Sequence, residues 1–368
     1  MIKRYKKQFG ILLLVAAGLF CMIRYQSIGS HLVSEQAASR FGNDGERYAQ
    51  ISAFFTEDAT VTQNSLNGYR SGIRKSLEEA SIQAANQDAR LWMDCYSSKR
   101  TETVTSEGSS QKVNMIGVGG DFFYFHPLTM LQGYYFAPNE ESKDRILIDQ
   151  QVAWDLFGSD DVVGKSIEIG GKKCRIAGVF LLEEDKVTKQ SVGKLSQIMV
   201  PFELFAGEDV GSTKIGCYQM LLPNPVSGFA KQLALKNVAG VDLSKTTLAD
   251  ANLEDLEVEI IENSNRFEVP SLLRVMKEFQ VRTMKRKALE YPFWENIARA
   301  KENEKTAMLG LVVLIWLYPL LVGISWLWKR FRNRKWTIRY FYKIMQEKQE
   351  VRKRKKWEEK RNEKKEIH

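Results

Sequence analysis

The sequence has little of what most enzyme active sites need. It contains only three histidines, His31, His126 and His368, which are too scattered to indicate a metal site or a triad base. No Gly-x-Ser-x-Gly motif occurs. We therefore predict no catalytic residue, no cofactor-binding residue and no metal ligand, and we expect a protein that is not an enzyme.

Cysteines are also few, and no Cys-x-x-Cys pair occurs among them. Cys21 lies in an apolar run, whereas Cys95, Cys174 and Cys217 are far apart in the chain. This pattern excludes a disulfide framework and a cysteine metal site. Buried thiols are the expectation, and a single disulfide between two of the last three cysteines remains open.

One short motif resembles a nucleotide-binding loop but lacks its spacing. A phosphate-binding loop needs four residues between its first glycine and the Gly-Lys-Ser sequence. Here five residues separate Gly158 from Gly164-Lys165-Ser166. We interpret the motif as the start of a β-hairpin and do not expect this chain to hydrolyse nucleotides.

Positive charge is concentrated at the two ends of the chain. Residues 1–10 carry four basic residues and no acid, and residues 329–368 carry 17 Lys or Arg against six Glu. Because the total net charge is only +9, the remainder is acidic. This distribution argues against a nucleic-acid partner and is typical of a membrane protein with both termini in the cytoplasm.

Two apolar runs agree with this interpretation. Phe9 to Ile23 and Ala307 to Trp328 contain no charged residue. We predict a protein of the cell membrane with transmembrane helices over residues 9–25 and 307–328. Residues 1–8 would be a cytoplasmic N-terminus, and residues from about 26 to 306 would be extracytoplasmic.

A cleaved signal peptide is the competing interpretation of the first run. Cleavage requires small residues after the apolar stretch, and Cys21-Met22-Ile23-Arg24 offers none. A lipoprotein site at Cys21 is disfavoured because Phe20 precedes it. We therefore favour an uncleaved anchor.

Hydrophobic periodicity predicts strands at 48–55, 91–96, 113–118, 145–149, 197–201, 217–222 and 256–260, and a hairpin over 165–180. A helix is predicted within 61–84, with Leu66, Tyr69, Ile73, Leu77 and Ala80 on one face. A short helix is predicted over 151–157, and a further helix starts at Pro223-Asn224-Pro225 and continues through Ala234. The Ser/Thr-rich stretch 101–111 is typical of a loop or hairpin tip. A helix is predicted from Pro270, with Leu273, Met276, Phe279 and Thr283 on one face.

Two charged segments have alternative interpretations. An acidic patch comprises Asp250, Glu254, Asp255, Glu257, Glu259 and Glu262, which lack the spacing of a calcium loop, so a solvated face is favoured. The basic tail, 329–368, is either a solvated stop signal or an amphipathic segment that lies on anionic lipid or docks a cytoplasmic partner. Its apolar stripe would comprise Trp336, Tyr340, Phe341 and Ile344.

Short glycine-punctuated segments follow one another in the middle of the chain: Gly117–Phe123, Gly133–Phe136, Ile146–Asp149, Leu156–Gly158, Val163–Gly171 and Ile176–Val179. In order and spacing these segments resemble the periplasmic core domain of MacB/FtsX-like ABC transporter permeases. It is strong over residues 113–180 and extends loosely over 1–328.

The resemblance implies an α+β fold. A porter-like α+β domain over 31–118 and 206–270 would receive an inserted β-rich domain over 119–205. A stalk helix over 271–306 would then enter the second transmembrane helix.

The resemblance also implies a function. We expect a non-catalytic membrane subunit of an ABC-type export or envelope-remodelling complex, coupled through the stalk to a cytoplasmic ABC ATPase. A full-length permease subunit, membrane lipids and a second copy of the chain are further expected partners. Family permeases usually have four transmembrane helices, whereas this reduced form has two. A membrane-tethered binding or scaffold protein without transport coupling is therefore the alternative.

Overall fold

The computed structural model describes residues 2–30, 32–42, 46–84, 86, 89–106, 108–138, 140–243, 256–278, 289–333 and 338–366. The helices are α1 (Ile2–Ser27), η1 (Val33–Glu35), α2 (Ala37–Phe41), α3 (Gln63–Glu79), α4 (Phe122–Phe125), α5 (Gln150–Phe157), α6 (Lys186–Val192), α7 (Phe202–Ala206), α8 (Phe229–Val238), α9 (Val269–Glu278), α10 (Phe293–Asn333) and α11 (Ile338–Glu366). The strands are β1 (Tyr48–Phe55), β2 (Met93–Ser106), β3 (Ser109–Gly120), β4 (Thr129–Gly133), β5 (Arg145–Asp149), β6 (Ser166–Ile169), β7 (Lys172–Leu181), β8 (Gln197–Pro201), β9 (Cys217–Pro223) and β10 (Val258–Glu262).

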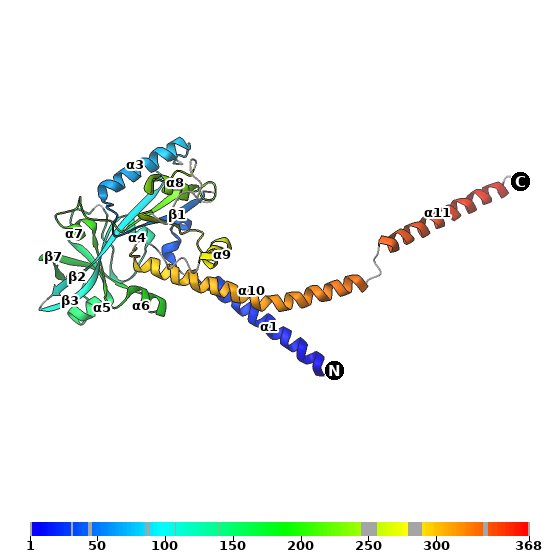
Figure 1. The fold of residues 1–368 in the computed structure, drawn as a ribbon, viewed down its shortest axis with the longest axis horizontal. Coiled ribbons are helices and arrows are strands. Elements are labelled where there is room, and N and C mark those ends of the chain that lie inside the picture. The colour runs from blue at the N-terminus through cyan, green and yellow to red at the C-terminus, as the bar shows by residue number, and fades with distance from the viewer. Residues whose placement is uncertain are drawn as a thin grey trace. The chain divides into compact units, whose positions relative to one another are not determined.

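The chain divides into two units, Gln26–Ala307 and the pair of end segments Met1–Tyr25 with Met308–His368. Unit Gln26–Ala307 is a mixed α+β domain. Its strands run in the order β10-β1-β9-β2-β3-β8-β5-β7-β4, and β6 pairs with both β2 and β7 (Figure 1).

The extra pairings of β6 close part of this sheet into a small β-barrel made of β2, β3, β8, β5, β7 and β6. Strand β2 takes part in both the barrel and the antiparallel layer formed by β10, β1 and β9. Its first half, Met93–Ser97, pairs with β9, whereas Val104 and Thr105 near its end pair with β6. The long β2–β3 hairpin therefore connects the barrel to the antiparallel layer β10-β1-β9.

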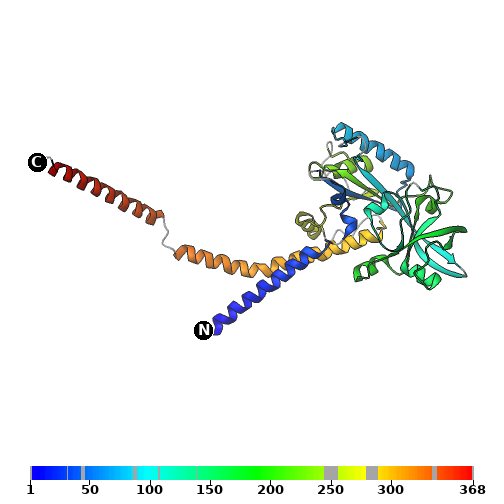
Figure 2. The ribbon, with the colours of Figure 1, turned by 180° about the vertical axis from the view of Figure 1, so that it is seen from behind.

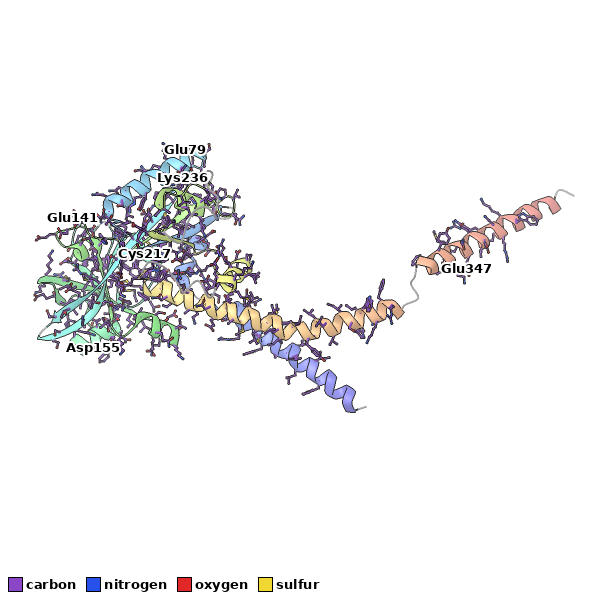
Figure 3. All side chains as sticks on the ribbon, in the orientation of Figure 1. Glu79, Glu141, Asp155, Cys217, Lys236 and Glu347 are labelled. Carbon is purple, nitrogen blue, oxygen red and sulfur yellow. The ribbon has the colours of Figure 1, made fainter. Side chains whose placement is uncertain are left out.

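Helices α3 and α8 cover one face of the antiparallel layer (Figures 1 and 2). The predicted face of α3 is confirmed, since Leu66, Ile73 and Leu77 are buried in the main core. An ion pair between Glu79 and Lys236 joins α3 and α8 at the surface (Figure 3).

The predicted short helix and hairpin of the barrel are confirmed. Helix α5 begins after Asp149, whose side chain accepts a hydrogen bond from the Val152 amide, and ends at Gly158 with φ of 64°. The turn Gly170-Gly171 connects β6 and β7, and both glycines have positive φ, which residues with a side chain rarely adopt.

The stretch 101–111 contains the tip of the β2–β3 hairpin, which confirms one of the two interpretations of its sequence. The loop interpretation is wrong, because β2 continues to Ser106 and β3 starts at Ser109. Two further secondary-structure predictions are wrong in detail. Helix α8 starts at Phe229 and not at Pro223, which ends β9. In α9 the structure buries Leu272 and Val275, whereas the predicted Leu273 and Met276 are exposed; Phe279 and Thr283 lie outside the described residues.

The other unit contains most of α1 and the part of α10 from Met308 onward. Helix α1 covers the first predicted span, and α10 contains the second. Within this unit, a side chain at Gly18 of α1 would meet Trp316 and Ile315 of α10, so a small residue is needed for this approach. Small residues at such crossings are typical of membrane helices.

Candidate functional site

The nucleotide-loop lookalike is the start of the β6–β7 hairpin, as predicted. The Gly164 amide donates to the Ile176 carbonyl, and the Ile176 amide donates to the Lys165 carbonyl. The Lys165 ammonium lies over the Phe157 ring, 4.9 Å from its centroid. These groups are engaged in the hairpin and do not form a phosphate cradle.

Of the candidate histidines and cysteines, His126 and Cys95 lie close together, because the His126 ring and the Cys95 thiol both contact the side-chain carbonyl of Gln219. His126 is buried after α4, whereas His31 and His368 lie outside the described residues. Cys95, Cys174 and Cys217 are buried free thiols, as the first interpretation predicted.

The acidic patch is only partly described, because Asp250, Glu254 and Asp255 lie outside the described residues. The prediction that it forms a solvated face is wrong for Glu259. That carboxylate lies 2.9 Å from Arg299 Nη2 of α10 and accepts a hydrogen bond from the Tyr291 hydroxyl. In the tail, Phe341 and Ile344 are exposed, Trp336 lies outside the described residues, and the Tyr340 side chain is likewise undescribed.

The most unusual feature of the domain is a buried guanidinium surrounded by carboxylates. Arg266 makes a bidentate ion pair with Glu295, at 2.8 and 3.0 Å. Its Nη1 also lies 3.1 Å from Glu35, and its Nη2 lies 3.4 Å from Glu302. The exposed fraction of each of these four side chains is 7% or less. We call these residues the Arg266 cluster.

The members of the cluster come from three separate segments. Glu35 ends η1, a few residues after α1, and Arg266 lies in the turn before α9. Glu295 and Glu302 lie on α10, before the apolar run of that helix. The cluster therefore joins the segment that follows the first apolar helix to the segment that precedes the second.

The surroundings of the cluster favour the charged form of Arg266 but not that of Glu35. Burial raises the pKa of Glu35, and Arg266 and the Asn263 amide offset this effect only in part. For Arg266, burial lowers the pKa, but the surrounding carboxylates outweigh burial and hold it well above its ordinary value. This arrangement predicts that Arg266 stays charged and that Glu35 is easily protonated.

A chain of buried polar side chains extends the cluster across the sheet. Asn263 donates to Glu35 and accepts from the Ser52 hydroxyl, at 2.8 Å each. Gln219 donates to Ser52 at 2.8 Å, and its carbonyl contacts the His126 ring. Strands β1 and β9 thus bury hydrogen-bonded polar groups on this face and apolar groups on the face beneath α3 and α8.

A second contact joins the same two segments close to the apolar helices. The Lys305 ammonium donates to the Ile28 carbonyl at 3.1 Å and lies 5.5 Å from the centroid of the Phe267 ring. Arg299 adds an ion pair to Glu295 one helical turn away, at 2.8 Å. Polar contacts therefore recur along α10 from Glu295 to Lys305.

Sequence reasoning did not find the Arg266 cluster. Arg266 and Glu35 are 231 positions apart, and each stands in a polar stretch that is typical of an exposed loop. Among the described residues the cluster offers no nucleophile beside a base and no group of metal ligands. What it can do is hold three chain segments in one arrangement.

The domain, with its small barrel and two flanking apolar helices, has the features expected of a permease-type extracytoplasmic module. The chain belongs to the family of MacB-like periplasmic core domains, whose sequence model matches residues 11–233. The resemblance predicted from the glycine-punctuated segments is therefore confirmed.

Among solved structures, the chain is similar to the extracellular domain of the noncanonic ABC-type transporter YknZ from Gram-positive bacteria. The two are 15% identical with a TM-score of 0.39, and the match covers 58% of this chain and 99% of that one. The periplasmic region of MacB from Actinobacillus actinomycetemcomitans is 13% identical with a TM-score of 0.41, covering 62% and 92%. No curated protein matches the sequence.

Proposed function

We propose that this chain is a non-catalytic membrane subunit of an ABC-type export or envelope-remodelling complex. In this proposal α1 and α10 cross the cell membrane, both termini are cytoplasmic, and the MacB-like domain is extracytoplasmic. Membership of the family supports the extracytoplasmic placement, and the basic ends support the orientation.

Coupling to a partner ATPase is the mechanical part of the proposal. The observation that carries it is the Arg266 cluster, which ties η1 and α10 together within the domain. Helix α10 continues without interruption from Glu295 into the apolar run 307–328. A displacement of that helix would be transmitted to the cluster, because separating a buried ion pair would leave unpaired charges in the interior. The partner ATPase would supply the nucleotide chemistry that we do not expect in this chain.

Within this proposal the domain division follows the family. Residues 31–118 and 206–270 would form the porter-like part, 119–205 the β-rich insert and 271–306 the stalk. Of the stalk, α9 ends at Glu278 and α10 begins at Phe293, directly after Pro292.

Co-purification tests the proposal. The tagged full chain, extracted from native membranes in mild detergent, should bring down an ABC ATPase or a full-length permease. A chain without residues 329–368 should lose that partner while its extracytoplasmic domain keeps the unfolding temperature of the full chain. Recovery of the untruncated chain without any such partner would contradict the proposal.

The alternative is a membrane-tethered binding or scaffold protein without transport coupling. It is favoured by the presence of two candidate spans among the described residues, where the resemblance implies four. The same truncation discriminates, because a tethered scaffold would bind its extracytoplasmic partners equally well without the tail.

A further inference from the structure

Helix α9 carries apolar side chains on two adjoining sides, and only one of these sides is buried. Leu272 and Val275 face the interior of the domain. Val269, Leu273 and Met276 stand four and three positions apart, so they share a second side of the helix. Their exposed fractions are 46%, 47% and 48%. We call these three residues the α9 stripe.

The helix begins beside the two points at which the chain leaves the domain for its apolar helices. A Cβ at Gly29, two residues after α1, would lie 3.1 Å from the Phe267 ring. The centroid of the same ring lies 5.5 Å from the Lys305 ammonium, two residues before the apolar run that starts at Ala307. Helix α9 begins at Val269, so its first Cα lies within about 7 Å of that of Phe267.

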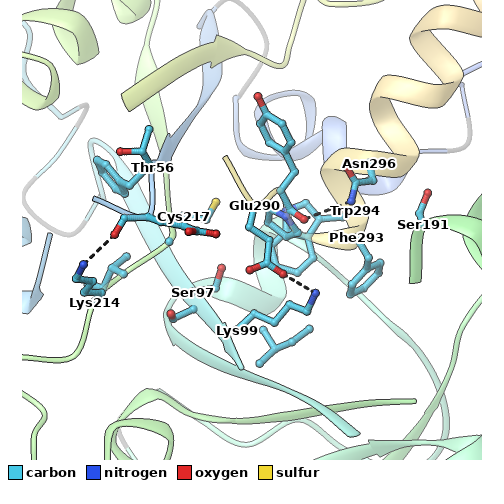
Figure 4. Close-up of a pocket in the computed structure, with 18 of the residues that line it drawn as sticks. Thr56, Ser97, Lys99, Ser191, Lys214, Cys217, Glu290, Phe293, Trp294 and Asn296 are labelled. Atoms are coloured by element: carbon cyan, nitrogen blue, oxygen red, sulfur yellow. Dashed lines mark hydrogen bonds and ion pairs between the residues drawn. The ribbon is translucent and has the colours of Figure 1, made fainter. Parts of the chain in front are cut away.

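Contacts of α10 with the domain keep α9 in this position. At the start of α10, Lys99 Nζ of β2 lies 3.0 Å from Glu290 Oε1, and the Asn296 amide donates to the Tyr291 carbonyl at 3.3 Å (Figure 4). Further along, the Arg266 cluster and Lys305 hold the helix. Both ribbon views show α9 alongside the part of α10 that belongs to this unit (Figures 1 and 2).

The polar residues of α9 are arranged as in a helix that lies on a membrane surface. At about 100° per residue, Lys277 adjoins the α9 stripe, whereas Arg274 and Glu278 lie on the side farther from it. All three are exposed. An interfacial helix buries an apolar stripe at the boundary between headgroups and acyl chains, while an adjoining lysine extends its ammonium to the headgroups.

We propose that α9 is such an interfacial helix, and that the α9 stripe inserts into the extracytoplasmic leaflet of the lipid bilayer. Insertion covers Val269, Leu273 and Met276 with acyl chains, and Lys277 contacts lipid phosphate. The lipid contact therefore fixes the height of the domain above the membrane. This inference rests on the proposed function in one respect, which is that α1 and α10 cross the membrane.

Fluorescence quenching by lipids with brominated acyl chains tests the contact. The full chain is reconstituted into vesicles of phosphatidylcholine and phosphatidylglycerol. The background is Cys21→Ser, because the other native cysteines are buried. Bimane labels at Leu273→Cys and Met276→Cys should be quenched at least about twofold more strongly than a label at Arg274→Cys, the matched control on the same helix.

Two further positions calibrate the quenching. Trp154 of α5 is 51% exposed and lies at the other end of the domain from α9, so a label at Trp154→Cys should be quenched no more than at Arg274→Cys (Figure 1). Leu314 lies within the apolar run of α10, so a label at Leu314→Cys should be quenched most strongly. Each substituted side chain is exposed, and every variant should keep the unfolding temperature of the background.

The inference would be overturned if Leu314→Cys were quenched and the two labels of the α9 stripe were quenched no more than Arg274→Cys. A blue-shifted emission of these labels without quenching would also overturn it, because a protein surface would then cover the stripe. In both cases the membrane placement stands. Absence of quenching at Leu314→Cys would refute the placement and the inference together. The vesicles contain no partner ATPase, so no result here bears on ATPase coupling.

Discussion

At the scale of single residues, the Arg266 cluster combines three buried carboxylates with one guanidinium. Arg299 adds a second cation beside Glu295. Burial raises the pKa of Glu35, so this carboxylate takes up a proton more readily than an exposed glutamate. Removing the charge of Glu35 should therefore cost little stability.

Replacing Arg266 tests the importance of the cluster. Arg266→Met leaves buried carboxylates without their counterion and should lower the free energy of unfolding by about 3–5 kcal/mol. Glu35→Gln keeps the shape and the hydrogen bonding of the side chain and should cost less than about 1 kcal/mol at pH 7. Urea unfolding of the purified chain in detergent measures both.

The matched control is Arg274→Met on the exposed face of α9, with an expected change within about 0.5 kcal/mol. If Arg266→Met were as stable as this control, the cluster would contribute nothing to the domain. A large loss for Glu35→Gln would show instead that Glu35 is ionised in the folded state.

His126 makes the stability of the domain depend on pH. Burial lowers the pKa of its imidazole to about 4, against an ordinary value of 6.5. Between these values the unfolded chain binds a proton that the folded chain does not, so stability is lost as the pH falls. From pH 7 to pH 5 this loss should be about 2 kcal/mol.

His126→Gln should abolish that part of the pH dependence. The variant retains a side chain that can hydrogen-bond to Gln219, and Arg40 and Glu295, the charged groups that act on His126, are the same in both proteins. The measurement is the difference in unfolding free energy between variant and unchanged chain at pH 7 and pH 5. A difference that does not change with pH would mean that His126 titrates normally.

At the scale of elements, short runs rich in apolar residues were sufficient to place several buried strands. Strands β1, β5 and β8 begin and end at the predicted residues. At 101–111 the loop interpretation failed for a physical reason, although the hairpin-tip interpretation is confirmed. There β2 leaves the antiparallel layer, and Thr101, Thr103 and Thr105 face solvent, so the sequence is polar although threonine suits a strand.

The Arg266 cluster could not be predicted for a different reason. Its members are brought together only when η1, the turn before α9 and α10 pack on the polar face of β1. Local patterns encode which residues share a face of one element. They do not encode which polar residues from distant segments are buried against each other.

Two glycines in the segments that resemble the family allow the stability cost of a backbone conformation to be measured apart from the cost of a steric clash. Gly133 and Gly171 both have positive φ, of 73° and 78°. A Cβ at Gly133 would lie 2.1 Å from the Ala177 carbonyl oxygen, whereas at Gly171 it would meet open space. Gly171→Ala should therefore cost about 1–2 kcal/mol, which is the cost of the conformation alone.

Gly133→Ala should cost several kcal/mol more and disrupt the pairing of β4 with β7, since the obstructing atom belongs to the backbone. Thermal unfolding of both variants, with hydrogen exchange at the β4 amides, provides the measurement. Equal losses for the two variants would show that β4 can move away from β7 without penalty.

At the scale of the whole molecule, the proposed topology assigns opposite sides of the membrane to two exposed positions, Glu141 and Glu347 (Figure 3). The native cysteines of the domain are buried, so the unchanged chain should react little with a membrane-impermeant maleimide. Glu141→Cys should be labelled in intact cells. Glu347→Cys should be labelled only after the membrane is permeabilised, because positive charge retains the tail in the cytoplasm.

The pattern of labelling distinguishes the arrangements that the apolar helices permit. If α10 does not cross the membrane, Glu347→Cys is labelled in intact cells together with Glu141→Cys. If the whole chain is cytoplasmic, neither variant is labelled until permeabilisation. Only labelling of Glu141→Cys alone places the Arg266 cluster on one side of the membrane and the basic tail on the other. That separation is the arrangement in which a cytoplasmic ATPase could act on the extracytoplasmic domain through α10.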